Sequence, residues 1–256
     1  MNPLRWREFA NALADVADAI TTAAFRSSFR VDTKSDGTWV TNIDRDVEQA
    51  LRQQIADEFP EHAVLGEEDG RIGDPSAPTW IIDPIDGTTN FVKGNPIFAT
   101  LIALQVEGVE VAAAVSAPAL SSRWDAAKGW PSRQSGREIQ VSSVASLDAA
   151  EVSFGGWRYF ADNGLADNLN QLAGATARQR GYGDFWQHCL VASGSTDIAV
   201  EADVNIWDLA AVKAVVEGAG GTFTSLDGEA TAAGGSAIST NGLLHEDVLA
   251  VMQARA

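Results

Sequence analysis

The sequence predicts an α/β fold in which helices and sheets pack in layers. In the first half, two amphipathic helical stripes precede a buried strand and a β-hairpin, a pattern that indicates helices over a sheet. The second half alternates short strands with helices, which is typical of an α/β layer. With 256 residues, of which 45% are hydrophobic, the chain can bury a large core in one broad domain or in two closely packed lobes.

Two helices are expected first. Apolar residues at helical spacing predict a helix over about residues 3–27, and a polar connector follows at residues 32–38. A second apolar stripe recurs every four residues and ends before Pro60, which stops the helix. The members of this stripe are Val47, Leu51, Ile55 and Phe59.

A sheet is expected next. Short strands are predicted near residues 63–65 and 79–83, and a hairpin over residues 99–115 turns at Glu107-Gly108. A passage rich in glycine, serine and proline around residues 128–136 then leads into the second half. The elements predicted there are a strand at 152–154, a helix at 165–177, a strand at 197–200, a helix from 208 to about 218, strands at 222–224 and 237–239, and a helix from about 245.

One stretch of the first half carries chemistry. The apolar run at residues 80–82 leads into two aspartates, Asp83 and Asp86, and Pro84 and Gly87 keep the strand from simply continuing. Two carboxylates this close repel each other unless a cation lies between them, and a hard divalent cation is the usual solution. The backbone N–H groups and hydroxyls of residues 87–89 suit an anion beside that cation. The stretch predicts a metal and a phosphate.

Charge and cysteine content restrict the binding partners and the cellular compartment expected for the chain. The chain has 18 Lys+Arg against 35 Asp+Glu, and a formal charge of -17 repels nucleic acid and anionic membranes, so neither is expected as a partner. The single cysteine, Cys189, excludes an intrachain disulfide and fits a reducing compartment. We expect a cytoplasmic protein, because no signal-peptide core or membrane-length apolar run is present. Such acidity suits phosphate chemistry only if bound metals or a cationic substrate offset it.

Three further acidic residues are ambiguous when each is taken alone. Glu67 lies in a glycine-bounded acidic run after a short apolar strand, where a solvated turn is the simpler interpretation. Asp208 opens a helix, and Asp44 stands at the start of another, where an aspartate most often caps the backbone or complements the helix dipole.

Together and in this order, these segments resemble the inositol monophosphatase superfamily of metal-dependent, lithium-sensitive phosphatases. The matching pieces are residues 34–41 with Asp44, Gly66-Glu67-Glu68, the Asp-Pro-Ile-Asp-Gly-Thr element at 83–88 with the residues up to Phe91, and Trp207-Asp208 with Ala210-Ala211 and Gly220-Gly221. The resemblance covers nearly the whole chain. It implies a layered α/β sandwich with an α+β lobe at residues 1–140 and an α/β lobe at residues 141–256, which share a metal cleft.

The resemblance also implies two or three Mg²⁺ ions per active site. One would bind Glu67, Asp83 and the carbonyl of Ile85, and a second would bind Asp83, Asp86 and Asp208. A third, weaker ion would lie near Glu67, which therefore counts as catalytic as well as metal-binding.

The resemblance also implies which residues contact the attacking water and the phosphate. Asp44 with Thr88 corresponds to the pair that orients the attacking water, and the backbone at Gly87 and Thr88 would hold phosphate oxygens. Mg²⁺ activates water and offsets phosphate charge, so no covalent enzyme intermediate is required. Neither Cys189 nor any histidine is given a role.

Substrate choice is expected to depend on the second half. The run Tyr182-Gly183-Asp184 followed by an aromatic residue looks like the histidinol-phosphate phosphatase branch of the family, of the actinobacterial type. Asp184 would pair with a cationic group of the substrate, while Phe185 or Trp186 would pack its ring. Glu201 matches a family glutamate that contacts the organic part, and Asp208 would lie near the substrate too. Asp184 could instead cap the following helix, and Glu201 could lie on an exposed strand edge.

The expected function is Mg²⁺-dependent hydrolysis of L-histidinol phosphate, a small phosphate monoester, as a step of histidine biosynthesis. Within the same class the main alternative is inositol-1-phosphate phosphatase. From a different class, the chain could be a catalytically silent regulatory member of the fold. The resemblance implies a homodimer.

Overall fold

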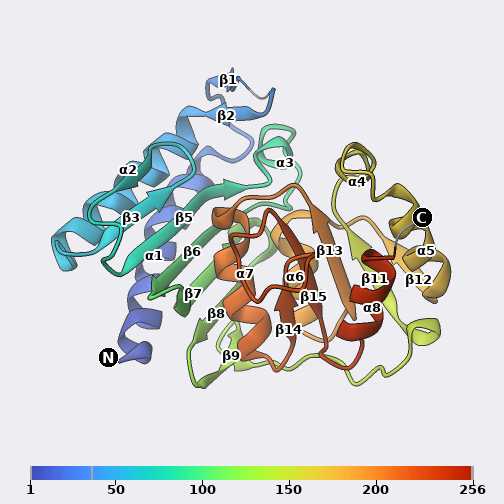
Figure 1. Cartoon of the computed structure of the whole chain (residues 1–256). Helices are drawn as coiled ribbons and strands as arrows, with labels where there is room; N and C mark the ends of the chain where they lie inside the picture. Colours follow the sequence, from blue (N-terminus) through green and yellow to red (C-terminus); the bar gives the residue numbers. More distant parts are fainter. Residues whose placement is uncertain (1, 36, 255–256) are drawn as a thin grey trace.

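The structure is a computed structural model that describes residues 2–35 and 37–254. Asp36, which belongs to the predicted polar connector, lies outside the described residues. The helices and strands of the protein form five layers, in the order helices, sheet, helices, sheet, helices (Figure 1). The α/β layer prediction is confirmed.

The larger sheet has eight strands and lies entirely within the first 140 residues. Its spatial order is β10-β9-β8-β7-β6-β5-β3-β4, and every pair is antiparallel except β3 with β5. The strands are β3 (Ala63–Gly66), β4 (Gly70–Ile72), β5 (Thr79–Asp86), β6 (Ala99–Val106), β7 (Val109–Ala117), β8 (Ser122–Ala127), β9 (Trp130–Gln134) and β10 (Arg137–Glu138).

Two N-terminal helices cover one face of this sheet. Helices α1 (Pro3–Ala24) and α2 (Asn42–Glu58) bury their apolar stripes against β5, β6 and β7. Helix α1 ends three residues earlier than predicted, because Phe25 adopts an extended ψ of 127° and packs its ring against Phe91 and Phe98. The early end of α1 thus completes an aromatic cluster rather than another helical turn.

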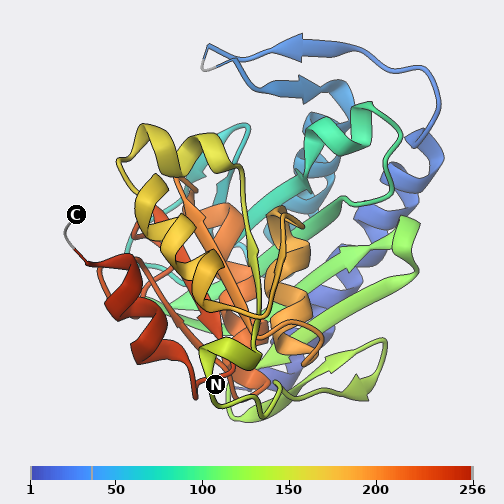
Figure 2. The ribbon, with the colours of Figure 1, turned by 90° about the vertical axis from the view of Figure 1, so that its right-hand side faces the viewer.

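The smaller sheet lies in the C-terminal half and has the order β12-β11-β13-β15-β14. Its strands are β11 (Glu151–Phe154), β12 (Arg178–Arg180), β13 (Ile198–Ala202), β14 (Thr222–Thr224) and β15 (Ser236–Thr240). Helices α6 (Asp184–Ala192) and α7 (Ile206–Gly218) fill the space between the two sheets. Helices α4 (Trp157–Asp162), α5 (Ala166–Ala175) and α8 (His245–Met252) cover the outer face (Figure 2).

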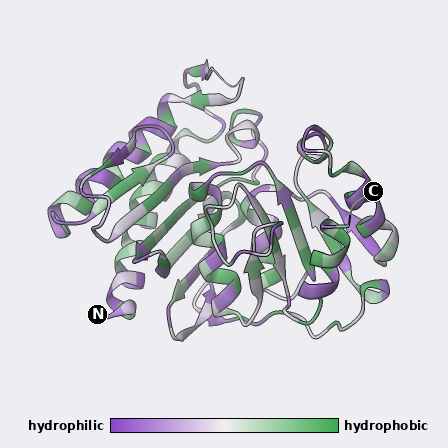
Figure 3. Ribbon diagram, in the orientation of Figure 1, coloured by the Kyte–Doolittle hydropathy of each residue, from purple (hydrophilic) through white to green (hydrophobic). Residues whose placement is uncertain are grey.

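The two predicted lobes share the middle helical layer. Helix α7 comes from the second half of the chain, yet it packs on β5, β6 and β7 of the larger sheet. The two sheets themselves fall on either side of residue 140, which we keep as a proposed lobe boundary. Apolar residues concentrate on the strands and on the helix faces that pack against them (Figure 3). Within residues 2–35 and 37–254, none of the helices is both long and apolar enough to cross a bilayer.

Several segments differ from the sequence prediction, including the following three. At the two ends of the predicted polar connector, β1 (Val31–Thr33) and β2 (Trp39–Thr41) pair as antiparallel strands. The passage at residues 128–136 contains β9, because Gly129 makes the tight turn at a φ of 83° and Pro131 sits where the register of β8 and β9 shifts, so its missing N–H costs no ladder bond. The residues after Asp86 form a short helix, α3 (Thr88–Val92).

Candidate active site

A β-bulge in β5 turns the two aspartates of the motif toward the same face of the sheet. The strand was predicted to end at Asp83, but it runs on to Asp86. Its register against β6 shifts between these two residues. Asp83 pairs with Leu101 and Asp86 with Ala99, so three steps along β5 match two steps along β6. Residues three apart in a regular strand point to opposite faces, whereas the inserted residue brings both carboxylates to one side. Pro84 belongs to this irregular stretch.

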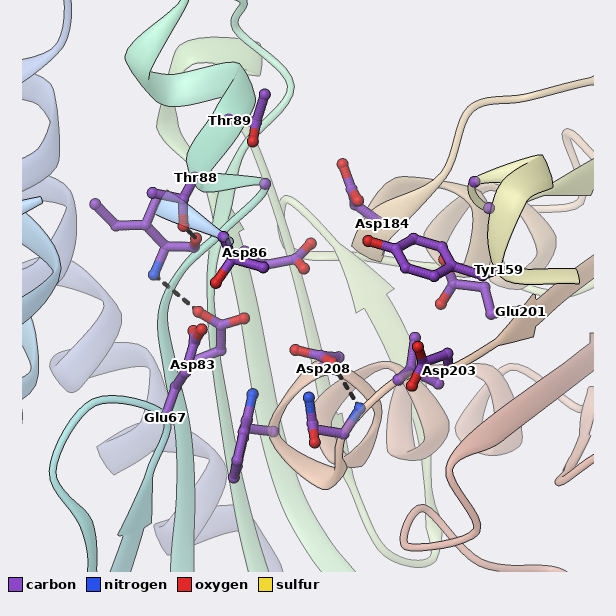
Figure 4. Close-up of a pocket in the computed structure, with 18 of the residues that line it drawn as sticks. Glu67, Asp83, Asp86, Thr88, Thr89, Tyr159, Asp184, Glu201, Asp203 and Asp208 are labelled. Carbon is purple, nitrogen blue, oxygen red and sulfur yellow. Dashed lines mark hydrogen bonds between the residues drawn. The ribbon is translucent and has the colours of Figure 1, made fainter. Parts of the chain in front are cut away.

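Helix α7 brings a third carboxylate to the pair. One carboxylate oxygen each from Asp83, Asp86 and Asp208 lies within 4.8 Å of the others. Asp208 is the third residue of α7, and its Oδ2 accepts the N–H of Asn205 at 2.7 Å in a capping box. The cap predicted for Asp208 is therefore present, and the same side chain also lies in the acidic group (Figure 4). Capping and a place in the site are compatible at this position.

These carboxylates lie in a cleft of about 810 Å³ between the two halves of the chain. Every proposed site residue except Asp44 and the two aromatic candidates, Phe185 and Trp186, lines it. The proposed residues in its lining are Glu67, Asp83, Ile85, Asp86, Gly87, Thr88, Asp184, Glu201 and Asp208. Figure 4 shows Glu67, Asp83 and Asp86 on one side of the cleft and Asp184 and Glu201 on the other.

The acidic group is electrostatically strained. Burial, followed by repulsion from Glu67 and Asp86, raises the pKa of Asp83 well above its ordinary value, and burial with Asp184 and Asp208 nearby does the same to the pKa of Asp86. Burial also raises the pKa of Asp208 to about 7. Three carboxyl groups that resist ionisation at such short range form a site whose charge a divalent cation with oxygen ligands would relieve.

The predicted water-orienting pair forms a direct contact. Thr88 Oγ1 lies 3.3 Å from Asp44 Oδ1 and 2.9 Å from the carbonyl oxygen of Ile85. Because a hydroxyl has one hydrogen, it donates to one of these acceptors at a time. Asp44 is fully buried, and its other oxygen accepts the N–H of Thr41 at 2.8 Å, so this aspartate also closes a capping box, at the start of α2. Burial raises the pKa of Asp44, although the hydrogen bonds from Thr41 oppose that shift.

Glu67 lies in a turn that the rest of the protein holds in place. Lys34 Nζ lies 2.7 Å from Glu67 Oε1 and 2.7 Å from Glu68 Oε1. Burial opposes the charge of Lys34, but these hydrogen bonds raise its pKa. Glu67 therefore does not occupy an ordinary solvated turn. Its carboxylate lines the cleft but is not among the three that lie within 4.8 Å of one another.

Glu48 anchors that turn, a role that no sequence pattern predicted. Its side chain is fully buried on α2, where it accepts the N–H groups of Glu68 at 2.9 Å and Asp69 at 3.0 Å. Arg52 pairs with the same carboxylate at 2.6 Å and keeps its charge satisfied. Glu48, which lies 20 residues before Glu68 in the sequence, thus fixes the backbone beside Glu67.

Gly87 allows the two walls of the cleft to approach each other. Its φ of 76° favours glycine, and a Cβ there would lie 3.4 Å from Asp184 Oδ2 and 3.0 Å from the carbonyl oxygen of Ile97. Asn90 Nδ2 donates to Asp184 Oδ2 at 3.2 Å, and the N–H of Phe185 donates to Asp86 Oδ2 at 2.7 Å. The beginning of α6 is thereby joined to the motif that follows β5.

The opposite wall carries the residues predicted to choose the substrate. Asp184 begins α6 without capping it through its side chain, so the capping alternative is wrong. Burial, followed by repulsion from Glu201, raises the pKa of Asp184 to about 6. Glu201 lies on β13, the central strand of the smaller sheet, and is 7% exposed, so the exposed-edge alternative is wrong as well.

The aromatic residue on this wall is not one of the two predicted. Phe185 packs in the core, where it is 1% exposed, and neither Phe185 nor Trp186 lines the cleft. Tyr159 of α4 does, and it lies beside Asp184 and Glu201 (Figure 4). No sequence pattern predicted Tyr159, because it lies on a short helix far from the metal motif in the sequence. Asp203, with a φ of 76°, is a second residue of this wall that the sequence analysis missed.

Comparisons with known proteins agree with this geometry. The family model described as the inositol monophosphatase family matches residues 3–255. The chain belongs to the inositol monophosphatase family. Its relatives include proteins named histidinol-phosphatase from Mycobacterium tuberculosis, 48% identical over 96% of each chain, and from Streptomyces coelicolor, 39% identical over 96% of each chain. The solved structure of a Thermotoga maritima IMPase superposes with a TM-score of 0.87 at 31% identity and covers 96% of this chain and 95% of that chain.

Membership of this family makes the protein a phosphatase with a layered α/β fold. The family fold also implies a metal cofactor, and the donor set fits one. Asp83, Asp86 and Asp208 offer only oxygen ligands, from positions close enough together to share a cation.

Proposed function

We propose that this protein hydrolyses L-histidinol phosphate to L-histidinol and phosphate, with Mg²⁺ as cofactor, and serves histidine biosynthesis. The observation that carries the proposal is the acidic wall opposite the three-carboxylate group. Asp184 and Glu201 both line the cleft there, and among the described residues neither forms an ion pair with a lysine or arginine. A ligand with positive charge on its organic part would supply the missing partner.

Histidinol phosphate has that charge distribution. Its phosphate end is anionic, whereas its organic end carries an ammonium group and an imidazole. Asp184 and Glu201 can accept hydrogen bonds from these groups, and the ring of Tyr159 offers an aromatic face for a cation or an imidazole. A neutral polyol would leave the buried carboxylate of Glu201 and the partly buried carboxylate of Asp184 without a cation. The relatives from Mycobacterium and Streptomyces, both named histidinol-phosphatase, support the same choice.

We assign the cofactor to the acidic group and the phosphate to the adjoining turn. Asp83, Asp86 and Asp208 would hold Mg²⁺, with Glu67 and the carbonyl of Ile85 as further oxygen donors for a second or third ion. Mg²⁺ supplies positive charge that activates water and offsets the charge of the phosphate.

The protein's own groups orient the reactants. Thr88 can donate its hydrogen to Asp44 and accept a hydrogen bond from the attacking water, which fixes the direction of a water lone pair. The N–H groups of the first turn of α3, beginning at Gly87 and Thr88, have no acceptor within that helix and can hold phosphate oxygens.

Phosphate release decides the substrate. Purified protein is assayed with Mg²⁺ on histidinol phosphate and on inositol 1-phosphate, and we expect a clear preference in kcat/KM for histidinol phosphate. The matched control for the acidic-site variants described below is Asp57→Asn. This substitution removes an exposed negative charge on α2. A preference for inositol 1-phosphate would replace the proposal with the polyol phosphatase alternative. A folded protein that releases phosphate from neither ester would favour the catalytically silent member of the fold.

We also propose a homodimer. Light scattering during size-exclusion chromatography checks the assembly, with an expected mass of twice that of the chain. A monomer at micromolar concentration would contradict it.

A further inference from the structure

A buried histidine stands behind one of the two carboxylates on the substrate side of the cleft. His188 lies on α6 and is 1% exposed. Its Nε2 is 3.3 Å from Glu201 Oε2, and its Nδ1 is 2.7 Å from Ser239 Oγ. No role was predicted for this histidine from the sequence, and it does not line the cleft. It therefore reaches the cleft only through Glu201.

The register of the smaller sheet explains why these groups meet. Glu201 and Ala199 of β13 are two residues apart and share a face, and Ser239 of β15 pairs directly with Ala199. Glu201 and Ser239 thus project from one face of two neighbouring strands. Helix α6 packs on β13 and β15, and His188 lies between the two side chains.

The two oxygens of Glu201 have different surroundings. Oε2 faces His188, whereas Oε1 lies where a side chain on Gly155 would be, 2.9 Å from the position of its Cβ. Gly155 itself lines the cleft. The φ of Gly155 does not lie in the left-handed region, so the glycine serves here to leave space for the carboxylate. One oxygen is held from behind while the other occupies the cleft wall.

Hydrogen-bond chemistry assigns the protons. A neutral imidazole has one N–H donor and one acceptor nitrogen. A carboxylate accepts only, so the nitrogen that faces Glu201 must carry the hydrogen, and Nδ1 then accepts the hydroxyl hydrogen of Ser239. The opposite tautomer would direct the lone pair of Nε2 at the carboxylate.

We propose that His188 is a positioning residue for Glu201, and that the chain Ser239–His188–Glu201 holds this carboxylate in place and directs it at the cationic group of the substrate. The inference rests on the proposed function and names a further residue that determines its specificity. Because His188 does not line the cleft, it contributes to recognition of the organic part only through Glu201. Without its N–H, Glu201 loses a hydrogen-bond donor in a buried place and binds a cation less well.

His245 provides a matched control inside the same domain. It is also buried, and its ring lies between the hydroxyls of Thr224 and Thr240, at 2.9 Å from Nε2 and 3.1 Å from Nδ1. It has no carboxylate partner among these contacts, and it lies on α8 outside the lining of the cleft. A histidine that serves packing alone is therefore available for comparison.

The kinetic test compares two esters in four proteins: wild type, His188→Phe, His188→Gln and His245→Phe. We expect His188→Phe to raise KM for histidinol phosphate about tenfold, the scale of one hydrogen bond to a charged group, while kcat/KM for the neutral ester glycerol 2-phosphate changes by less than about twofold. His188→Gln should recover most of the loss, because an amide can donate to Glu201 and accept from Ser239. His245→Phe should affect both esters alike. Equal losses on both esters in His188→Phe, or no recovery in His188→Gln, would overturn the proposal.

A spectroscopic measurement tests the contact without catalysis. In protein labelled with ¹⁵N at histidine, we expect His188 to show the Nε2–H tautomer, and Glu201→Gln to move its resonances while those of His245 stay in place. A Nδ1–H tautomer, or resonances unchanged by Glu201→Gln, contradicts the proposal. If wild-type protein failed to hydrolyse histidinol phosphate, the proposed function would be wrong, whereas this measurement would still decide whether His188 holds Glu201.

Discussion

The two walls of the cleft are both acidic, but they are built differently. On the metal side, Asp83, Asp86 and Asp208 place oxygens within 4.8 Å of one another. On the organic side, Asp184 and Glu201 each contact a separate side chain, Asn90 in one case and His188 in the other. Charge packed into so small a volume suits small ions of high charge, whereas carboxylates that each contact a polar neighbour suit a larger, singly charged organic group. In the proposed function, the arrangement of acids, more than their number, separates cofactor binding from substrate recognition.

The strongest test of this comparison removes one charge from the metal side. Asp83→Asn should lower kcat roughly 10³-fold or more, because this carboxylate is central to the acidic group that offsets the charge of the reacting phosphate. The metal-free variant should unfold at no lower temperature than wild type, since the substitution relieves repulsion from Glu67 and Asp86. Phosphate release and thermal unfolding measure the two effects, with Asp57→Asn as control. Retained Mg²⁺-dependent turnover would remove the assignment.

The corresponding change on the organic side should act on substrate affinity. Asp184→Asn should raise KM for histidinol phosphate roughly 10- to 100-fold, because a hydrogen-bonded charge pair with the substrate is lost. For glycerol 2-phosphate the change should be small. Steady-state kinetics on both esters measures it. If both esters suffered equally, Asp184 would belong functionally to the metal side, and the comparison of the walls would fail.

The response to pH should depend on metal. Burial raises the pKa of Asp208 to about 7 and that of Asp184 to about 6 in the folded protein, whereas an unfolded chain titrates near 4. The folded state therefore binds more protons in this interval, and stability falls as pH rises from about 4 to 7. In EDTA, the Tm should be lower at about pH 8 than at about pH 5, and added Mg²⁺ should raise it more at the higher pH, because ionised carboxylates bind the metal.

Asp208→Asn supplies the control for the pH measurement. It should weaken the pH dependence of the Tm in EDTA, because the group with the higher of the two pKa values is gone. A wild-type Tm that increased over the same pH range without metal would show that the raised pKa values do not govern stability.

The smallest expected effect concerns the aromatic part of the organic wall. Tyr159→Ala should raise KM for histidinol phosphate roughly two- to fivefold, the scale of a partly exposed cation–π contact. Tyr159→Phe should remain near wild type if the ring face, and not the hydroxyl, contacts the substrate. Kinetics of both variants checks this, and an equally large loss in Tyr159→Phe would assign the contact to the hydroxyl instead.

The sequence predicted the metal side well because its central residues are contiguous. The element from Asp83 to Thr88 by itself predicts a metal and a phosphate, and the family resemblance adds Glu67 and Asp208. The bulge that aligns Asp83 with Asp86 was not predicted, because it depends on pairing with β6 and not on the local sequence. Asp44 and Asp208 could each be a cap or a site residue, and the structure shows that each is both. Asp44 uses one oxygen for its helix and the other for Thr88, and Asp208 accepts the N–H of Asn205 and also belongs to the acidic group.

The organic side was predicted only in part because tertiary contacts create it. Asp184 and Glu201 were found through the family pattern, but the aromatic assignment to Phe185 or Trp186 was wrong. Helix α6 directs Phe185 into the core, and the separate helix α4 places Tyr159 at the cleft instead. No local pattern joins Tyr159 to residues 184 and 201. His188 was passed over for the same reason, since its partners lie on two different strands.

Helix α6 gives these walls a mechanical connection. The N–H of Phe185 holds Asp86 on the metal side, and His188, less than one turn further along the same helix, holds Glu201 on the organic side. A displacement of this short helix therefore moves both contacts together, without a flexible loop between them. We expect cation affinity and affinity for the organic group to be thermodynamically linked through α6, and reciprocity then requires each ligand to change the binding constant of the other by the same factor.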